Sequence, residues 1–166
     1  KMNELINRIT QGDCIQVMKL LPNESIDLIL TDPPYGITNL LRSGQEPETS
    51  KSRQQRGQAK VRAAEFNFEN WDKFSTKEDF LQWTHTWVNE AIRVLKKGRM
   101  IISYFDKDQI NFLSRYLTKD KKFLLRGYYA DCKNNPAPRP AKDKWMMGWE
   151  IIGIWKKNGD KPYFDK

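Results

Sequence analysis

Residues 26–35 read Ile26-Asp27-Leu28-Ile29-Leu30-Thr31-Asp32-Pro33-Pro34-Tyr35, an apolar run that ends in an acid, two prolines and an aromatic ring. The run 26–31 is rich in apolar and β-branched residues and is bounded by turn formers, so it predicts a short buried strand. The prolines end that strand because neither carries an N–H and both have a fixed φ. We therefore expect the next four residues at the carboxyl edge of a sheet, where open α/β sheets bind ligands.

This turn has the groups needed to recognise an aromatic amine. The Asp32 carboxylate can accept one N–H of a planar –NH2 group, and the Pro33 carbonyl can accept the other. Pro34 stiffens the turn, and the Tyr35 ring can stack on the base that carries the amine. The alternative is a structural turn that ends a strand, with Asp32 as its cap and Tyr35 packed against it.

The flanking sequence strongly resembles the amino-methylating DNA methyltransferases, which use S-adenosylmethionine to methylate adenine N6 or cytosine N4. It is most similar to the permuted group, whose catalytic motif lies near the N-terminus. The resemblance implies an α/β, Rossmann-like, mainly parallel sheet with helices on both faces and a terminal antiparallel pair. The matching segments occur in collinear order at residues 9–14, 17–22, 25–36, 91–98, 133–138 and 149–157.

The resemblance assigns catalytic roles to the turn and cofactor roles to two neighbouring segments. Asp32, Pro33, Pro34 and Tyr35 would hold the amine of a flipped base, and adenine N6 is favoured because cytosine enzymes more often begin this motif with Ser. Asp32 and Pro33 would also border the cofactor. Asp13 and Cys14 are the other cofactor candidates.

For Asp13 and Cys14 the residue types leave a second, structural role open. Asp13 can be the N-cap of a helix at 14–20, and Gly12 before it frees the backbone for close approach to a ligand. Cys14 can be a small buried hydrophobe that begins the helix.

One departure from the family concerns the Gly-rich loop that cradles the methionine end of the cofactor. The chain has nine glycines, and no two of them form a G-x-G. We therefore expect a single methyltransferase catalytic domain over residues 1–166 that is incomplete at its C-terminus. Two alternatives follow: an inactive or partner-dependent DNA-binding module derived from a methyltransferase, and a methyltransferase that acts on RNA.

The charge favours a nucleic-acid partner, and double-stranded DNA is the expected one. The net charge is +8, and two stretches concentrate basic residues: a segment at 39–65 that we expect to be a mobile loop, and a Pro-rich connection at 133–148 expected near the target base. The alternative for the first stretch is an ordinary solvated loop. The DNA-binding candidates are Arg42, Arg53, Arg56, Lys60 and Arg62 in the first stretch, and Lys133, Asn135 and Arg139 in the second.

Other classes of site and partner are disfavoured. The two cysteines and single histidine cannot build a metal framework, so no metal is expected. The chain has neither an apolar run of membrane-spanning length nor a signal peptide, which predicts a cytoplasmic protein without a membrane partner. Homodimers are common in the resembled group, and a restriction partner stays open.

Periodicity predicts the remaining elements. An amphipathic helix covers the pattern from Phe80 to Leu95, with Gly98 as its C-terminal cap. The other expected elements are strands at 8–11, 99–105, 123–132 and 149–157 and a helix at 108–117.

Overall fold

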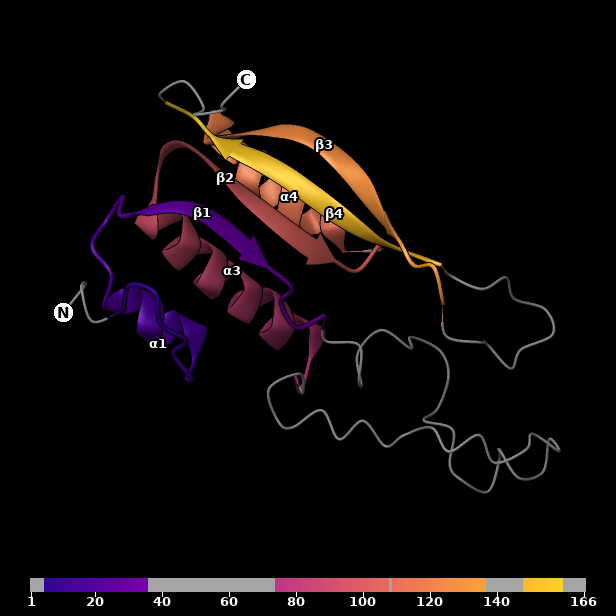
Figure 1. The fold of residues 1–166 in the computed structure, drawn as a ribbon, viewed down its shortest axis with the longest axis horizontal. Coiled ribbons are helices and arrows are strands. Elements are labelled where there is room, and N and C mark those ends of the chain that lie inside the picture. The colour runs from indigo at the N-terminus through magenta and orange to yellow at the C-terminus, as the bar shows by residue number, and fades with distance from the viewer. Residues whose placement is uncertain (1–4, 36–73, 108, 137–147, 160–166) are drawn as a thin grey trace, which may run out of the picture.

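The computed structural model describes residues 5–35, 74–107, 109–136 and 148–159. These residues form a sheet of four strands with helices packed against it (Figure 1). In chain order the elements are α1 (Cys14–Lys19), β1 (Ile26–Thr31), α3 (Lys77–Val94), β2 (Leu95–Phe105), α4 (Ile110–Thr118), the 3-10 helix η2 (Lys119–Lys121), β3 (Phe123–Cys132) and β4 (Trp149–Lys157).

The strands lie in the order β1-β2-β4-β3. β1 pairs with β2 in parallel, while β2 with β4 and β3 with β4 are antiparallel. The α/β class and the terminal antiparallel pair are thus confirmed, and the sheet of the described residues is mixed. The predicted bounds of β1, β3 and β4 match the structure.

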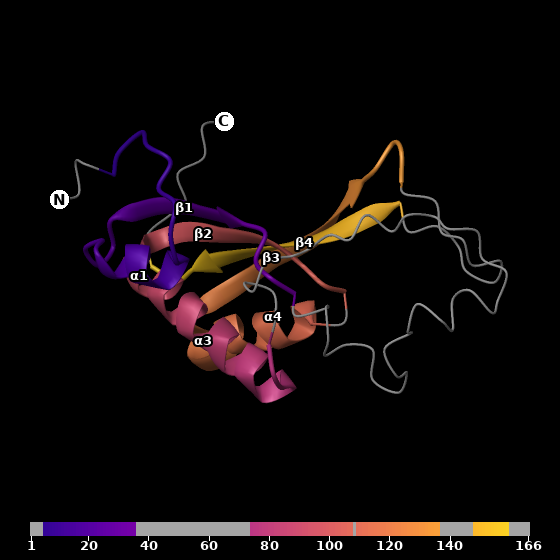
Figure 2. The ribbon, with the colours of Figure 1, turned by 90° about the horizontal axis from the view of Figure 1, so that it is seen from below.

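The described helices cover one face of the sheet. In Figure 2, α1, α3 and α4 all lie on the same side of the strands. On that side Ile101 and Trp155 are 1% and 0% exposed, whereas Leu28 and Leu30 of β1 are 51% and 65% exposed. We predicted helices on both faces, and the described residues show them on one.

α3 begins at Lys77, three residues before the predicted pattern, and ends earlier than Gly98. Thr76 and Asp79 form a reciprocal capping box at its start. The helix ends at Val94 and passes directly into β2, where the backbone of Leu95 is already extended. Lys157 of β4 donates to the carbonyls of Ile92 and Leu95 at 2.8 and 2.7 Å. A cation from another strand therefore takes the capping role that we predicted for glycine.

Gly98 instead lies in an irregular stretch of β2, with φ of +75°. Ile26 pairs with Leu95 and Leu28 pairs with Met100, so residues 96–99 bulge out opposite Asp27. Asp27 accepts from Lys96 Nζ at 2.7 Å and from Arg99 Nε at 3.0 Å. The bulge thus brings two cations to one carboxylate. β2 begins at Leu95, four residues before the predicted start at residue 99.

Two further expectations about elements need correction. The predicted strand at 8–11 is wrong: these residues form no strand, and Ile9 is fully exposed, so no neighbouring strand supports its β-propensity. α4 begins at Ile110, after a turn in which the Asp106 carbonyl accepts from the backbone N–H groups of Gln109 and Ile110. No helix within the described ranges is long and apolar enough to cross a membrane.

Candidate active site

The turn at 32–35 lies where the sequence places it, directly after β1. Because β1 and β2 are parallel, this turn meets the carboxyl end of β2, which Phe105 closes. The Tyr35 ring packs edge-on against Phe105, with centroids 5.9 Å apart and planes at 61°. Gln109, just before α4, donates from Nε2 to the Tyr35 carbonyl at 3.0 Å. Two elements far along the chain therefore hold the turn.

Asp32 and Tyr35 are brought into direct contact. The Tyr35 phenol donates a hydrogen bond to Asp32 Oδ1. Burial, followed by this bond and the charge of Asp32, raises the pKa of the Tyr35 phenol far above its usual range. The phenol therefore stays neutral and remains a donor at any working pH. Asp32 is exposed and Pro33 is buried, so the carboxylate faces solvent from a turn that is packed beneath it.

The contact leaves Asp32 able to accept more bonds. A carboxylate has two oxygens with about four lone-pair sites, and Tyr35 uses one. Stacking by the Tyr35 ring was the predicted role, and the hydroxyl contact that orients the acid is an addition from the structure.

Asp13 and Cys14 lie at the start of α1. Asp13 is the N-cap, and its Oδ1 accepts from the backbone N–H of Ile15 at 2.8 Å and of Gln16 at 3.4 Å. The capping prediction is confirmed. Cys14 is exposed, so the alternative of a buried hydrophobe is wrong. Desolvation by surrounding atoms, and then the charge of Asp13, raise the pKa of the Cys14 thiol, so it is not primed as a nucleophile.

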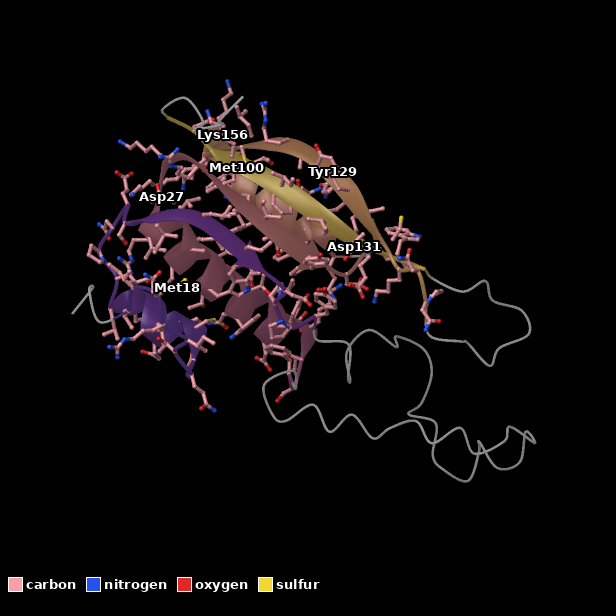
Figure 3. All side chains as sticks on the ribbon, viewed as in Figure 1. Met18, Asp27, Met100, Tyr129, Asp131 and Lys156 are labelled. Atoms are coloured by element: carbon pink, nitrogen blue, oxygen red, sulfur yellow. The ribbon has the colours of Figure 1, made fainter. Side chains whose placement is uncertain are left out.

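Polar groups that sequence reasoning missed lie at the same end of the sheet, on β2, β3 and β4. Tyr104 donates to Asp131 Oδ2 at 3.0 Å, and Asp131 pairs in register with Glu150. Figure 3 labels Asp131 towards this end of β3, with Met100 and Lys156 towards the other. The hydrogen bond to Asp131 raises the pKa of Tyr104, and the charge of Asp32 adds to the shift.

A topological signal could have found one further acid at this end of the sheet, Asp106. A residue that directly follows a strand parallel to β1 lies at the ligand-binding edge, and Asp106 holds that place after β2. Its charge is among those that raise the pKa of Tyr35. Nothing in the local sequence marks Tyr104, Asp131 or Glu150.

The DNA candidates divide into those the structure describes and those it does not. Lys133 pairs with Glu150, which raises the pKa of Lys133, and its backbone N–H donates to the Gly148 carbonyl at 2.6 Å. Asn135 is exposed. The candidates Arg42, Arg53, Arg56, Lys60, Arg62 and Arg139, with all of segment 39–65 and residues 137–147 of the connection, lie outside the described residues.

A metal centre finds no support in the parts of the chain that the structure describes. Across them, no group of three or more His, Cys, Asp or Glu residues could hold an ion. The carboxylates near the turn are instead held by phenol and ammonium donors, as with Asp131 and Glu150.

A family model described as DNA methylase matches residues 26–166, a range that begins with β1 and includes the turn. The chain belongs to the N6_N4_Mtase family of DNA methylases. The predicted resemblance to amino-methylating DNA methyltransferases is therefore confirmed, and the 32–35 turn lies inside the matched range.

Two relatives of this DNA methylase chain are type II methyltransferases. It is 33% identical over 164 residues to M.HinfI of Haemophilus influenzae, covering 95% of the chain and 41% of that relative. It is 29% identical over 118 residues to M.BamHI of Bacillus amyloliquefaciens, covering 71% of the chain and 22% of that relative. The chain thus spans less than half the length of either relative.

Solved structures support the fold. The PvuII DNA methyltransferase, described as cytosine-N4-specific, aligns with a TM-score of 0.57 at 15% identity, over 93% of this chain and 50% of that one. The M1.HpyAVI–SAM complex aligns with a TM-score of 0.51 at 17% identity, over 96% and 61% respectively. At these identities the likeness establishes a methyltransferase-like fold for the DNA methylase chain.

Proposed function

We propose that this chain carries the amine-binding half of a DNA methyltransferase site and transfers a methyl group to the exocyclic amine of a flipped base, with adenine N6 favoured. The observation that carries the proposal is the turn at 32–35, where an exposed acid and an aromatic ring are hydrogen-bonded at the carboxyl edge of a parallel strand pair. The adenine preference rests on Asp at the first position of the turn.

The turn offers two acceptors for one amine. Asp32 retains lone pairs beyond the one that Tyr35 uses, and the carbonyl of Pro33 is a second acceptor in the same turn. Two in-plane hydrogen bonds to –NH2 leave the nitrogen lone pair directed out of the ring plane, towards an electrophile. A base in a duplex cannot reach these acceptors, so it must leave the stack.

S-adenosylmethionine would supply that electrophile as a sulfonium-bound methyl group. The exposed Asp32 carboxylate and the adjacent Pro33 fit one side of such a site, and the backbone around Asp13 and Cys14 is the proposed partner on the other. The Asp13 side chain already caps α1, so its contact to the cofactor would use its remaining lone pairs. These residues bind and orient; positioning supplies much of the rate in a direct displacement.

Duplex DNA is the proposed partner because the chain is basic and belongs to a DNA methylase family. The basic residues of 39–65, Lys133 and Arg139 are the proposed phosphate contacts, and Asn135 would offer its amide to a base edge. Lys133 would have to exchange its pairing with Glu150 for a phosphate. A homodimer, a restriction partner and a cytoplasmic location belong to the same proposal.

One sequence feature favours a second candidate function, a DNA-binding module that is active only with a partner. The chain contains no G-x-G, the type of loop with which the resembled family cradles the methionine end of the cofactor. Calorimetric titration with S-adenosylmethionine at low salt separates the two. Micromolar binding supports the enzyme, and duplex binding without cofactor binding supports the module.

The turn is tested with Asp32→Asn, which keeps the size of the side chain and removes its charge. We expect methyl transfer to duplex DNA to fall by about 100-fold or more, while duplex affinity changes by less than about threefold. Asp120→Asn is the matched control, since Asp120 is exposed at a left-handed position, φ of +56°, that Asn tolerates. Equal turnover by Asp32→Asn and the parent chain refutes the proposed role. If the parent chain methylates structured RNA as fast as duplex DNA, the proposed substrate changes from DNA to RNA.

A further inference from the structure

Gln109 occupies the N-cap position of α4 without using its side chain as a cap. Its backbone is fixed on both sides: its N–H donates to Asp106 at 3.0 Å, and its carbonyl accepts from Phe112 and Leu113 at 2.8 and 3.3 Å. Ser, Thr, Asp or Asn at an N-cap accepts a hydrogen bond from a backbone N–H and thereby stabilises the helix. α4 forgoes that contribution, and the amide of Gln109 instead reaches the Tyr35 carbonyl, 74 positions away in sequence.

The other end of this amide has no such partner. Among the described residues, Gln109 Oε1 is buried and accepts no hydrogen bond. An unsatisfied buried acceptor destabilises the folded state, so the placement of this amide needs an explanation. The contact that the Gln109 side chain does make is therefore the one from its Nε2 to the Tyr35 carbonyl.

The turn needs support from outside itself. Pro33 and Pro34 have no N–H, so the turn has few internal hydrogen bonds with which to define its geometry. Tyr35 is held at three points: the phenol by Asp32, the ring edge by Phe105 and the carbonyl by Gln109. Only the last of these fixes the backbone of the turn.

We infer that Gln109 is a positioning residue for the acid–ring pair, an inference that rests on the proposed function. Its Nε2–H holds the Tyr35 carbonyl, and this sets the ring face and, through the phenol, the orientation of Asp32. Displacement of reacting groups by about 1 Å can lower a rate by about 100-fold. The loss of this contact should therefore act on turnover more than on binding.

The kinetic test uses Gln109→Glu, which keeps the shape, removes both N–H donors and sets an acceptor against the Tyr35 carbonyl. We expect kcat for methyl transfer to fall by about 10- to 100-fold, with KM for duplex DNA changed by less than about twofold. Gln82→Glu makes the same chemical change on the exposed face of α3 and serves as the control. An unchanged kcat, or an equal change in both variants, overturns the inference.

A spectroscopic test keeps the inference separate from the proposed function. The chain contains six tyrosines, and fluorine NMR of fluorotyrosine-labelled protein resolves them, with Tyr35→Phe assigning the line of Tyr35. We expect Gln109→Glu to shift or broaden that line and to leave the other lines in place, as Gln82→Glu leaves them all. A Tyr35 line that does not respond refutes the positioning role.

The kinetic test and the NMR test distinguish failure of the proposed function from failure of the positioning role. If the parent chain transfers no methyl group, the proposed function fails for this chain, and the Tyr35 line alone decides the role of Gln109. If Gln109→Glu does not fold, Gln109→Ala removes the donor without adding charge and is subject to the same criteria.

Discussion

Gly153 of β4 lies against the indole of Trp155, which leaves no room for the methyl group that an alanine at this position would add. A Cβ on Gly153 would stand 2.0 Å from one ring carbon of Trp155 and 2.6 Å from two others. Carbon atoms approach one another to about 3.5 Å, so the ring would have to move by about 1.5 Å. Trp155 is fully buried, and its Nε1 donates to Ser114 Oγ at 3.1 Å. The ring is therefore enclosed by other atoms, and its movement would break this hydrogen bond.

From these contacts we expect Gly153→Ala to lower the free energy of unfolding by about 2–4 kcal/mol. Overpacking contributes about 1–3 kcal/mol, and loss of the Ser114 hydrogen bond adds about 1 kcal/mol. Urea unfolding followed by far-ultraviolet circular dichroism measures the change. Gly148→Ala is the control, because its Cβ would meet nothing closer than 3.6 Å. A loss below about 1 kcal/mol, or one equal to that of the control, refutes the reasoning.

Two further predictions concern the acid–ring pair and the bulge. Tyr35→Phe keeps the ring and loses the phenol contact that orients Asp32, so we expect kcat to fall by about 10-fold. Tyr35→Ala also removes the stacking face and should lose about 100-fold or more. Single-turnover methyl transfer measures both, and equal losses would contradict the stacking role of the ring. The hydrogen bond from Lys96 lowers the pKa of Asp27, and Arg99 adds to the shift. Because the folded pKa lies below the unfolded value of about 3.9, the stabilisation is complete above that value and is lost as the pH falls through the folded pKa. Asp27→Asn should therefore lower the free energy of unfolding by about 0.5 kcal/mol at pH 7, as for an exposed ion pair, and should leave it unchanged below the folded pKa of Asp27. Urea unfolding at both pH values measures this difference. A loss of stability that persists in acid would count against a contribution from the ion pairs.

The strands that sequence predicted correctly are those with clear local boundaries. β1 ends at two prolines, and β3 and β4 are continuous runs rich in apolar and aromatic residues. The end of α3 was mispredicted because Lys157, 63 positions beyond Val94, supplies the cap. The strand expected at 8–11 has the right residues and no neighbour, and β-propensity depends on neighbours.

The site divides in the same way. Asp32 and Tyr35 lie three positions apart, so a four-residue motif was enough to place them together. Gln109 reaches the turn from 74 positions away and Tyr104 meets Asp131 across the sheet, contacts that only the strand order creates. Residue type alone did not distinguish Gln109 from an ordinary helix-start residue.

The bulge at residues 96–99 limits how β1 can evolve. Asp27, held by two cations, anchors one end of the strand, and Asp32 follows five positions later. Each residue advances a strand by about 3.3 Å and reverses the face of its side chain. A deletion of one residue between these two positions would therefore retract Asp32 by about 3.3 Å and turn it towards the helices. We therefore expect the residues between Asp27 and Asp32 to accept substitutions, whereas an insertion or deletion among them would displace Asp32.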